Sequence, residues 1–515
     1  MNRKTTHLFA LSPAWVLFLV FLFINLVQSY FTPLINDEPY YWLWSQQVAL
    51  GYFDHPPLIA WLIGAGNLLF HNELGVRIFT ALSGSFTLLF LYKIIEAETS
   101  KPVNWKLVAL LAGSSVFFNL YSFMAIPDTP LLFFTTLFLW QFRRYLNNDN
   151  TANSIALGLI CALLLYAKYH GILVIGLTVL ANIKLLKKRS FYLVFITTTI
   201  LFIPHIWWQF TNNFPTLRFH FIENLSEFNF KNVFSYLGEQ LALTGPVVLL
   251  LSTLFYKTQN PFQRTLKVVS LGIFAFFLIS SFRGMINAYW TLAAWPGLIV
   301  IAYLQLTEKK KAQKLAVPFL LISLAFVIFI RINFLFNLFP IPNFNNRNPQ
   351  KMVSTLKKAS NKPLVFVNSF IDPSLFLFYG NDSCYAINNS NYKKTQFNYM
   401  AKQEAQIQGK DVVLVTNYAI NNESKLVKIE KGRQYYLSEY PNFKSFQTTA
   451  HIDYSFPDKK YKAESKIMIP IVLNNTINAN QPDSIQQINI IFNMKLEKNG
   501  DLYTCTKNYQ LNSNK

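Results

Sequence analysis

Charged residues and cysteine are both scarce in this chain, and each scarcity narrows the class of protein. Only 14% of the 515 residues are charged, whereas 52% are hydrophobic and 49 are Phe. A composition this apolar predicts a polytopic membrane protein followed by a soluble part. The three cysteines, Cys161, Cys384 and Cys505, form no spacing with His that is typical of a metal site. The sequence also contains no glycine-rich phosphate loop.

Acidic residues are few as well. Asp and Glu number 25 against 46 Lys and Arg, which gives a formal net charge of +21. A charge of this size could indicate a nucleic-acid partner. Many of the basic residues, however, fall in short loops between apolar segments, where they orient helices toward the cytoplasm. We therefore expect membrane lipids as partners and no nucleic acid.

Long apolar runs predict a bundle of about eleven membrane spans, because about 20 apolar residues cross the hydrocarbon core. The expected spans are residues 12–30, 75–95, 106–123, 128–145, 152–167, 169–184, 191–209, 234–256, 266–282, 288–305 and 315–336. The stretch 57–70 is apolar but begins with proline after a polar loop, which favours an interfacial or re-entrant helix. Basic residues occupy alternate connections, so the positive-inside rule puts the N-terminus in the cytoplasm and the C-terminus outside.

This pattern divides the chain into two domains. Residues 1–340 are predicted to form a mainly α transmembrane domain, whose first external loop covers residues 31–74. Residues 345–515 are rich in Asn, Lys, Ser and Tyr and are predicted to form an exoplasmic soluble domain.

Short apolar runs bounded by turn residues predict buried strands in this soluble domain. They lie at 364–367 and 412–415, with an expected helix at 370–379 between them. The segments 465–473 and 485–496 look extended. We therefore expect an α/β or α+β fold for this domain.

Adjacent carboxylates follow the first span directly, at Asp37 and Glu38. Acids at the mouth of a helical bundle are candidates for a functional site, because burying them is costly without a partner or a task. The alternative is a pair of solvated loop acids. Tyr40, Tyr41 and Trp42 follow, and such aromatics either belong to the interfacial belt or stack on a sugar or a prenyl chain.

A third acid, Asp128, is predicted in a tight external turn between two spans. Because it precedes Thr-Pro, it could simply cap a helix. It could also act with Asp37, one acid serving as the base and the other orienting it.

Several cations and aromatic residues are predicted on the same external side as the acids. Lys168 interrupts two short apolar segments, where an ammonium either snorkels outward or binds an anion. Arginine suits phosphate because its fork can make bidentate contacts. The candidates for holding a phosphate or lining a substrate site are Lys168, Arg218, Arg283, His220, Asn287 and Trp290.

These motifs resemble a known family, the polyprenyl-phosphate-sugar transferases of the GT-C fold. This group includes glycosyltransferase family 39, the protein O-mannosyltransferases and the lipid A aminoarabinose transferase. The resemblance covers about residues 10–335. It rests on Asp37-Glu38-x-Tyr40-Tyr41, Asp54-His55-Pro56-Pro57-Leu58, Ile126-Pro127-Asp128-Thr129-Pro130, Lys168-x-x-Gly171, Pro204-His205-Ile206-Trp207 and Asn287-x-x-Trp290.

The resemblance implies an inverting transferase that takes its sugar from a polyprenyl-phosphate donor on the exoplasmic side. Asp37 would be the base, and the acceptor would be a hydroxyl or phosphate of lipid A, a protein or a surface glycan. Many members carry Lys where this chain has His55, which would then be a weaker ligand for the donor phosphate. No cofactor is implied, although two neighbouring acids keep a divalent metal open.

Other functions remain possible on the sequence alone. A transporter or flippase of a polyprenyl-linked sugar would use its buried ionisable groups as an ion path. A ligase or polymerase of surface glycans would use related lipid-linked donors, and a non-catalytic scaffold would bind through its tail.

Overall fold

The structure is a computed structural model. It describes residues 11–35, 37–218, 228–243, 247–339, 348–388, 394–420, 422–430 and 433–444, and the later strands 451–454, 471–474, 487–498 and 501–512. The chain divides into two compact units, Met1–Lys444 and Ser445–Lys515. The region 345–515, which the sequence groups into one soluble domain, therefore contributes to both units.

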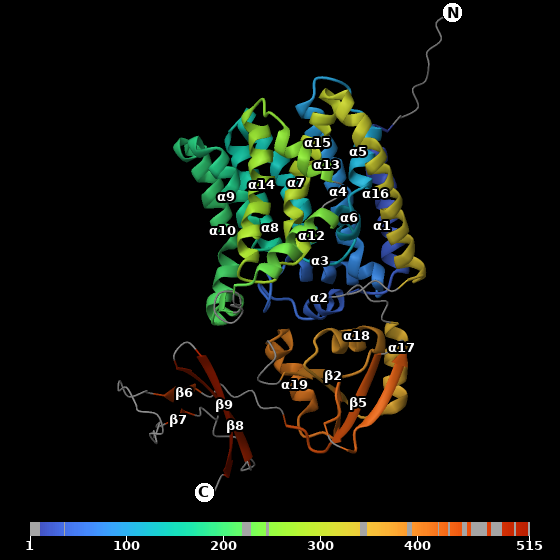
Figure 1. Cartoon of the computed structure of the whole chain (residues 1–515), viewed down its shortest axis with the longest axis vertical. Coiled ribbons are helices and arrows are strands. Elements are labelled where there is room, and N and C mark those ends of the chain that lie inside the picture. Colours follow the sequence, from blue (N-terminus) through green and yellow to red (C-terminus); the bar gives the residue numbers. More distant parts are fainter. Residues whose placement is uncertain are drawn as a thin grey trace, which may run out of the picture. The chain divides into compact units, whose positions relative to one another are not determined.

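The first unit begins with a helical bundle (Figure 1). Its α-helices are α1 (Pro13–Phe31), α2 (Glu38–Ser45), α3 (Leu58–Asn67), α4 (Glu73–Glu98), α5 (Trp105–Gly113), α6 (Val116–Tyr121), α7 (Asp128–Asn147), α8 (Thr151–Ala167), α9 (Gly171–Ala181), α10 (Arg189–Thr211), α11 (Pro215–Arg218), α12 (Phe230–Leu243), α13 (Val247–Phe255), α14 (Pro261–Ser281), α15 (Trp295–Glu308) and α16 (Lys310–Phe336). Short 3-10 helices lie at Ile183–Lys187 (η1) and Ala288–Ala294 (η3).

The described residues contain 6 helical segments long and apolar enough to cross a membrane, by length and composition. They are α1, α4, α10, α14, α16 and the continuous segment Ala288–Glu308. Helices α3, α8 and α9 are apolar but shorter. The mainly helical fold is thus confirmed, whereas the count of about eleven spans is not.

One expected span, 106–123, proves to be two helices. α5 ends at Gly113 and α6 begins at Val116. The side chain of Ser115 caps α6 by accepting a hydrogen bond from the Phe118 amide at 3.3 Å. The side-chain NH2 group of Asn119 donates to the carbonyl oxygens of Ala112 and Gly113, each at 3.0 Å. Such local side-chain bonds compete with the helical ladder, which explains why hydropathy alone misses this break.

The segment between α1 and α4 is folded into two short helices, α2 and α3. Helix α3 crosses α4 at two glycines: a Cβ added at Gly66 would lie 2.0 Å from the carbonyl oxygen of Gly75. Only glycine permits this backbone approach, so the pair fixes α3 against the start of α4. The helix expected at 57–70 is therefore present, as a ten-residue element.

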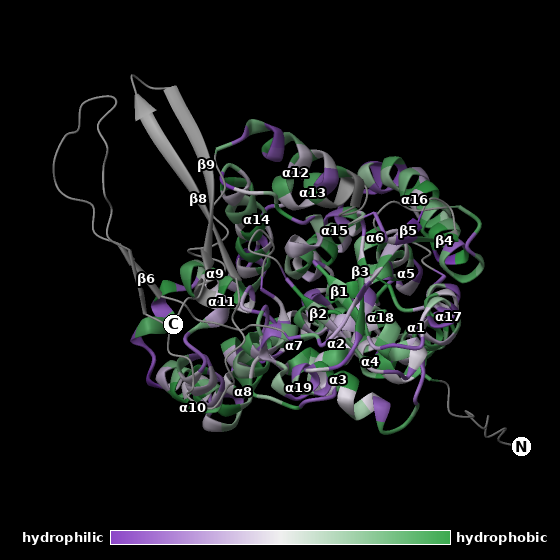
Figure 2. Ribbon diagram, turned by 90° about the horizontal axis from the view of Figure 1, so that it is seen from below, coloured by the Kyte–Doolittle hydropathy of each residue, from purple (hydrophilic) through white to green (hydrophobic). Residues whose placement is uncertain are grey.

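The rest of the first unit is an α/β fold, as expected. Its elements are α17 (Pro349–Ala359), β1 (Leu364–Val367), α18 (Ile371–Gly380), β2 (Cys384–Ile387), η4 (Gln396–Tyr399), α19 (Ala401–Ile407), β3 (Val412–Thr416), β4 (Lys425–Glu430) and β5 (Arg433–Tyr440). The sheet order is β2-β1-β3-β5-β4, with β1 parallel to β2 and β3, and β5 antiparallel to β3 and β4. The apolar strands β1 and β3 that the sequence predicts form its centre (Figure 2).

This α/β part is hydrogen-bonded to the segment between α1 and α4, and α18 packs against α2 (Figure 1). The Tyr379 hydroxyl accepts from the Leu34 amide and donates to Glu73 Oε1, both at 2.9 Å. Gln396 uses its amide N–H to reach the Tyr40 hydroxyl at 2.6 Å, and its side-chain oxygen to accept from the Phe53 amide at 2.9 Å. These bonds explain why one compact unit includes both the bundle and residues as far as Lys444.

The second unit contains two antiparallel strand pairs. β6 (His451–Tyr454) pairs with β7 (Ile471–Asn474), and β8 (Gln487–Lys498) pairs with β9 (Asp501–Asn512). Strand β8 confirms the extended segment expected at 485–496, whereas only the end of the segment 465–473 falls on a described strand.

We predict that Tyr379→Phe destabilises the first unit. The change leaves the buried Leu34 amide without its acceptor, and such a loss costs about 1–3 kcal/mol. Thermal unfolding in detergent should show a lower Tm. Tyr418→Phe, at a tyrosine 54% exposed on the same α/β part, is the matched control. Equal Tm values for the two variants would contradict this role of Tyr379.

Candidate active site

Two of the predicted site residues form a buried ion pair. Asp128 is the first residue of α7, and Lys168 follows the last residue of α8. The Lys168 ammonium donates to both carboxylate oxygens of Asp128, each at 2.8 Å. Asp128 is 2% exposed and Lys168 is 3% exposed. The sequence left open whether Asp128 caps a helix. In the structure α7 has no side-chain cap, and the carboxylate faces Lys168 instead.

Asp37 lies near this pair. It is half-buried and directly precedes α2, and its carboxylate does not cap that helix. Its charge acts on the Lys168 ammonium. Both Asp37 and Asp128 act electrostatically on the phenols of Tyr41, Tyr121 and Tyr289. Two acids and one cation therefore share a neighbourhood lined by tyrosines, which we call the Asp37 cluster.

Aromatic rings complete this cluster. The Lys168 ammonium lies 5.3 Å from the ring centroid of Tyr289 and 5.8 Å from that of Trp290, which are cation–π distances. The Tyr41 side chain is buried. Burial raises the pKa of its phenol well above the ordinary value, and the Asp37 carboxylate raises this pKa further. Tyr41 therefore stays protonated at neutral pH and can donate a hydrogen bond.

Glu38, the neighbour of Asp37, is fully buried, and each of its two carboxylate oxygens accepts two hydrogen bonds. Its Oε1 accepts from Arg77 Nε at 2.7 Å and from the Ala125 amide at 2.8 Å. Its Oε2 accepts from Arg77 Nη2 at 2.5 Å and from the Ile35 amide at 2.7 Å. Glu38 and Arg77 are 39 positions apart, so no local pattern pairs them. The pair joins the start of α2 to α4 and to the loop before α7.

The other aromatic candidates pack around the cluster. The Tyr40 hydroxyl donates to Asp54 at 3.3 Å and accepts from the Gln396 amide. The Trp42 ring makes an edge contact with Phe378, at 5.0 Å between centroids. Both residues thus connect the segment between α1 and α4 to itself or to the α/β part. His55 is half-buried, with its ring 6.1 Å from that of Tyr41.

The remaining predicted residues are distributed unevenly. Trp290 belongs to the cluster, and its ring lies 5.3 Å from that of His170. Arg283 and Asn287 are exposed on the segment between α14 and η3. Arg218 ends α11, where its side chain is outside the described part of the structure, and His220 is outside the described residues altogether.

The Pro204-His205-Ile206-Trp207 motif lies on α10 and connects this helix to the segment between α1 and α4. His205 is buried, with Nε2 2.8 Å from the Tyr169 hydroxyl and Nδ1 2.7 Å from the Leu50 carbonyl oxygen. Among the cluster residues, Tyr121 is one that the sequence analysis did not select. No local pattern marks it, because it joins the acids only through packing of α6.

No group of three His, Cys, Asp or Glu side chains that could hold a metal occurs among the described residues. The adjacent acids also fit a metal poorly as a pair, because both Glu38 oxygens already accept hydrogen bonds from Arg77 and from backbone amides.

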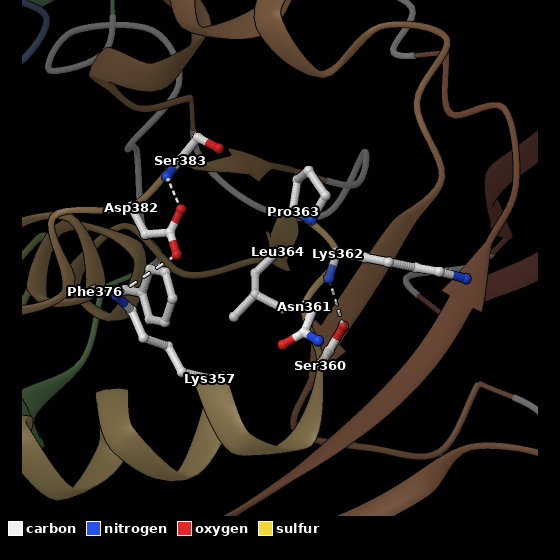
Figure 3. Close-up of a pocket in the computed structure, with 9 residues that line it drawn as sticks. All are labelled: Lys357, Ser360, Asn361, Lys362, Pro363, Leu364, Phe376, Asp382 and Ser383. Carbon is white, nitrogen blue, oxygen red and sulfur yellow. Dashed lines mark hydrogen bonds and ion pairs between the residues drawn. The ribbon is translucent and has the colours of Figure 1, made fainter.

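A separate pocket of about 220 Å³ lies in the α/β part (Figure 3). Its lining residues are Lys357, Ser360, Asn361, Lys362, Pro363, Leu364, Phe376, Asp382 and Ser383. The Lys357 ammonium donates to the Gly380 carbonyl oxygen at 2.5 Å and lies 3.6 Å from Asp382. The polar groups of this pocket thus largely pair with one another, and none of the predicted site residues lines the pocket.

Comparison with known proteins connects this geometry to a family. Residues 54–208 match the model of the dolichyl-phosphate-mannose-protein mannosyltransferase family, and this stretch contains Asp128 and Lys168. The lipid A galacturonosyltransferase RgtD of Rhizobium johnstonii is 25% identical over 232 residues, covering 42% of this chain and 48% of that protein. An uncharacterised protein of Aquifex aeolicus is 25% identical over 311 residues, covering 56% and 61%. The chain thus spans about half the length of these curated relatives.

Solved structures extend the comparison to most of the chain. The apo structure of ArnT from Cupriavidus metallidurans superposes with a TM-score of 0.60 at 15% identity, covering 82% of this chain and 97% of ArnT. The structure of the same ArnT bound to undecaprenyl phosphate gives 0.60 at 14% identity, covering 83% and 98%. The chain is therefore a multi-pass membrane protein with the GT-C fold of ArnT, and its residues 54–208 match the dolichyl-phosphate-mannose-protein mannosyltransferase model.

Proposed function

We propose that this chain is a membrane glycosyltransferase that moves a sugar from a polyprenyl-phosphate donor to an acceptor on the exoplasmic side, with Asp37 as general base. The observation that carries the proposal is the Asp37 cluster: a half-buried carboxylate beside a buried Asp128–Lys168 pair, in a fold shared with ArnT. The relatives' names support the class of reaction, since they describe transferases of sugars.

Lys168 is the proposed contact for the donor phosphate. An ammonium has three N–H donors, and two oxygens of Asp128 account for two short contacts. The third N–H can reach a phosphate oxygen, and the positive charge stabilises the negative charge that develops on the leaving group. Arg218, Arg283 and His55 are further proposed ligands. The ArnT structure with undecaprenyl phosphate supports a lipid phosphate as donor.

The proposed reaction is a single displacement. Asp37 takes the proton of the acceptor hydroxyl, or an acceptor phosphate attacks directly. The acceptor oxygen forms a bond to the sugar's anomeric carbon while the bond from that carbon to the phosphate oxygen breaks. The electron pair leaves with the lipid phosphate, and the configuration inverts. Because RgtD is named for lipid A, a lipid A acceptor is the first candidate, ahead of a protein or a surface glycan.

In this mechanism Glu38 is a positioning residue. Its two oxygens hold Arg77, Ile35 and Ala125, so no proton-accepting lone pair is directed at a substrate. It fixes the backbone next to Asp37 and next to the loop that leads to Asp128. Tyr289 and Trp290, which flank Lys168, are proposed to line the sugar site.

A transporter or flippase of a lipid-linked sugar is the second candidate, because the Asp128–Lys168 pair could belong to an ion path. The two functions differ in a direct measurement. A transferase makes a new glycosidic bond in detergent, where no membrane separates two compartments, whereas a flippase makes none.

We predict that Asp37→Asn lowers sugar transfer by at least about 10²-fold, because the amide cannot accept the proton. Transfer of label from a polyprenyl-phosphate sugar to lipid A, measured on purified protein, checks this. Asp149→Asn, at an exposed carboxylate, is the matched control and should leave transfer unchanged.

A variant of the neighbouring acid, Glu38, distinguishes the loss of a catalytic base from a loss of folding stability. Glu38→Gln places N–H groups against donors, so its main effect should be a lower Tm. A folded Asp37→Asn protein with near-normal transfer would disprove the base, whatever Glu38→Gln does.

Lys168→Met should destabilise the protein by about 3–5 kcal/mol, because it leaves the buried Asp128 carboxylate without its partner. The double variant Asp128→Asn/Lys168→Met removes both charges and should recover much of this stability without recovering transfer. Lys188→Met, which breaks the exposed pair with Asp149, should cost no more than about 1 kcal/mol. Normal donor affinity in the double variant would limit Lys168 to a structural role.

The exoplasmic orientation is tested separately. A periplasmic reporter enzyme fused after Lys515 should be active, because the basic loops place the C-terminus outside. A fluorescent reporter that requires the cytoplasm should stay dark at that position. The opposite pair of results would reverse the proposed side of the reaction.

A further inference from the structure

A cavity of about 460 Å³ lies between α1, α5 and α16. Its lining is apolar except for Gln28, Asn119 and Arg331, and it contains none of the residues of the Asp37 cluster. Side chains on its rim are largely exposed, including Val20 at 54% and Ile328 at 50%. Because α1 and α16 are both long enough to cross a membrane, these exposed faces point to bilayer lipid, and a lipid can enter from the side.

Arg331 is the unusual residue in this cavity. It is 8% exposed. Its Nη2 donates to Asn25 Oδ1 at 3.0 Å and to the Asn119 carbonyl oxygen at 2.6 Å. Its Nε and Nη1 are buried without a hydrogen-bond partner in the described structure.

No ion pair of the described residues includes Arg331. The guanidinium also lies over the rings of Phe21 and Phe123, at 5.5 and 5.6 Å. A buried charge and two buried donors without acceptors are costly unless a ligand supplies both an anion and acceptors.

The lining residues place this charge toward one end of the cavity, with Ile332 and Leu335 of α16 beyond it. The Gln28 amide reaches the Arg331 carbonyl oxygen at 3.4 Å, and Gln28 is three residues before the end of α1 at Phe31, or about 5 Å along the axis. The apolar lining continues along α1 to Leu17, about 16 Å from Gln28. A cation near the helix end and an apolar groove along the helix match a phosphate headgroup followed by a hydrocarbon chain.

We infer that this cavity is a binding site for an anionic phospholipid of the bilayer, with the headgroup phosphate on Arg331 and one acyl chain between α1 and α16. An inorganic phosphate would satisfy the charge but would leave the groove empty. A zwitterionic lipid would fill the groove but would bring a second cation to Arg331. The site is separate from the proposed donor site, since the two share no residue.

Native mass spectrometry of the full chain in neutral detergent tests this inference. The purified protein is titrated with phosphatidylglycerol, with phosphatidylcholine, with undecaprenyl phosphate and with inorganic phosphate. The intact protein should retain one phosphatidylglycerol at least about 10-fold more tightly than Arg331→Gln does, as expected for a charge-assisted contact. Arg264→Gln, at an exposed arginine, is the matched control and should retain the lipid.

A second variant tests the inference independently, in case Arg331→Gln does not fold. Ala109→Phe keeps Arg331 and fills the groove from α5, where Ala109 lines the cavity, and it should also lose the phosphatidylglycerol. The inference is overturned if Ala109→Phe or a folded Arg331→Gln retains the lipid as well as the intact protein. It is equally overturned if phosphatidylcholine or inorganic phosphate binds as well, or if undecaprenyl phosphate displaces the phosphatidylglycerol.

Discussion

The buried ion pair between Glu38 and Arg77 is the interaction on which the arrangement of the site depends. Arg77 on α4 also donates to the carbonyl oxygens of Ser29 and Pro33, so one guanidinium holds the end of α1 and the start of α2. Glu38 extends the link to the Ala125 amide, and α7 begins three residues later at Asp128. Asp37, the proposed base, and Asp128, the partner of Lys168, are thus both attached to this one pair. Breaking such a pair by removing one partner leaves an uncompensated buried charge, which is strongly destabilising.

Three cations are buried in the described part of the chain, each in a different environment. Arg77 has a carboxylate and backbone carbonyl oxygens, and Lys168 has Asp128 and two aromatic rings. Arg331 has only neutral oxygen partners in the described structure, and two of its nitrogens have none. This contrast separates Arg77, which organises the fold, from Lys168, for which we propose a contact to the donor phosphate, and from Arg331, for which we propose a contact to a lipid headgroup.

The α/β part forms hydrogen bonds with the segment between α1 and α4 and helps to fix its conformation. Tyr40, on α2 near the proposed base, forms hydrogen bonds with Asp54 and Gln396. Tyr379 forms hydrogen bonds with Leu34 and Glu73. Movement of this part would therefore be transmitted to α2. The arrangement suits the proposed transfer, in which the acceptor approaches from the soluble side and the donor lies in the membrane.

The sequence by itself determined the helical bundle and the apolar strands β1 and β3, because these follow from local hydropathy. From motifs along the chain it also selected the acids at 37, 38 and 128 as candidates. Only the tertiary structure decided how the charges are shared. Glu38 pairs with Arg77 across 39 positions and Asp128 pairs with Lys168 across 40, and no local pattern selects such partners. Arg331 left a visible signal, an arginine within the last apolar run, but its unmet donors are defined only by packing of α1, α6 and α16. Pairing of buried charges depends on three-dimensional proximity, which one sequence encodes only through the complete fold.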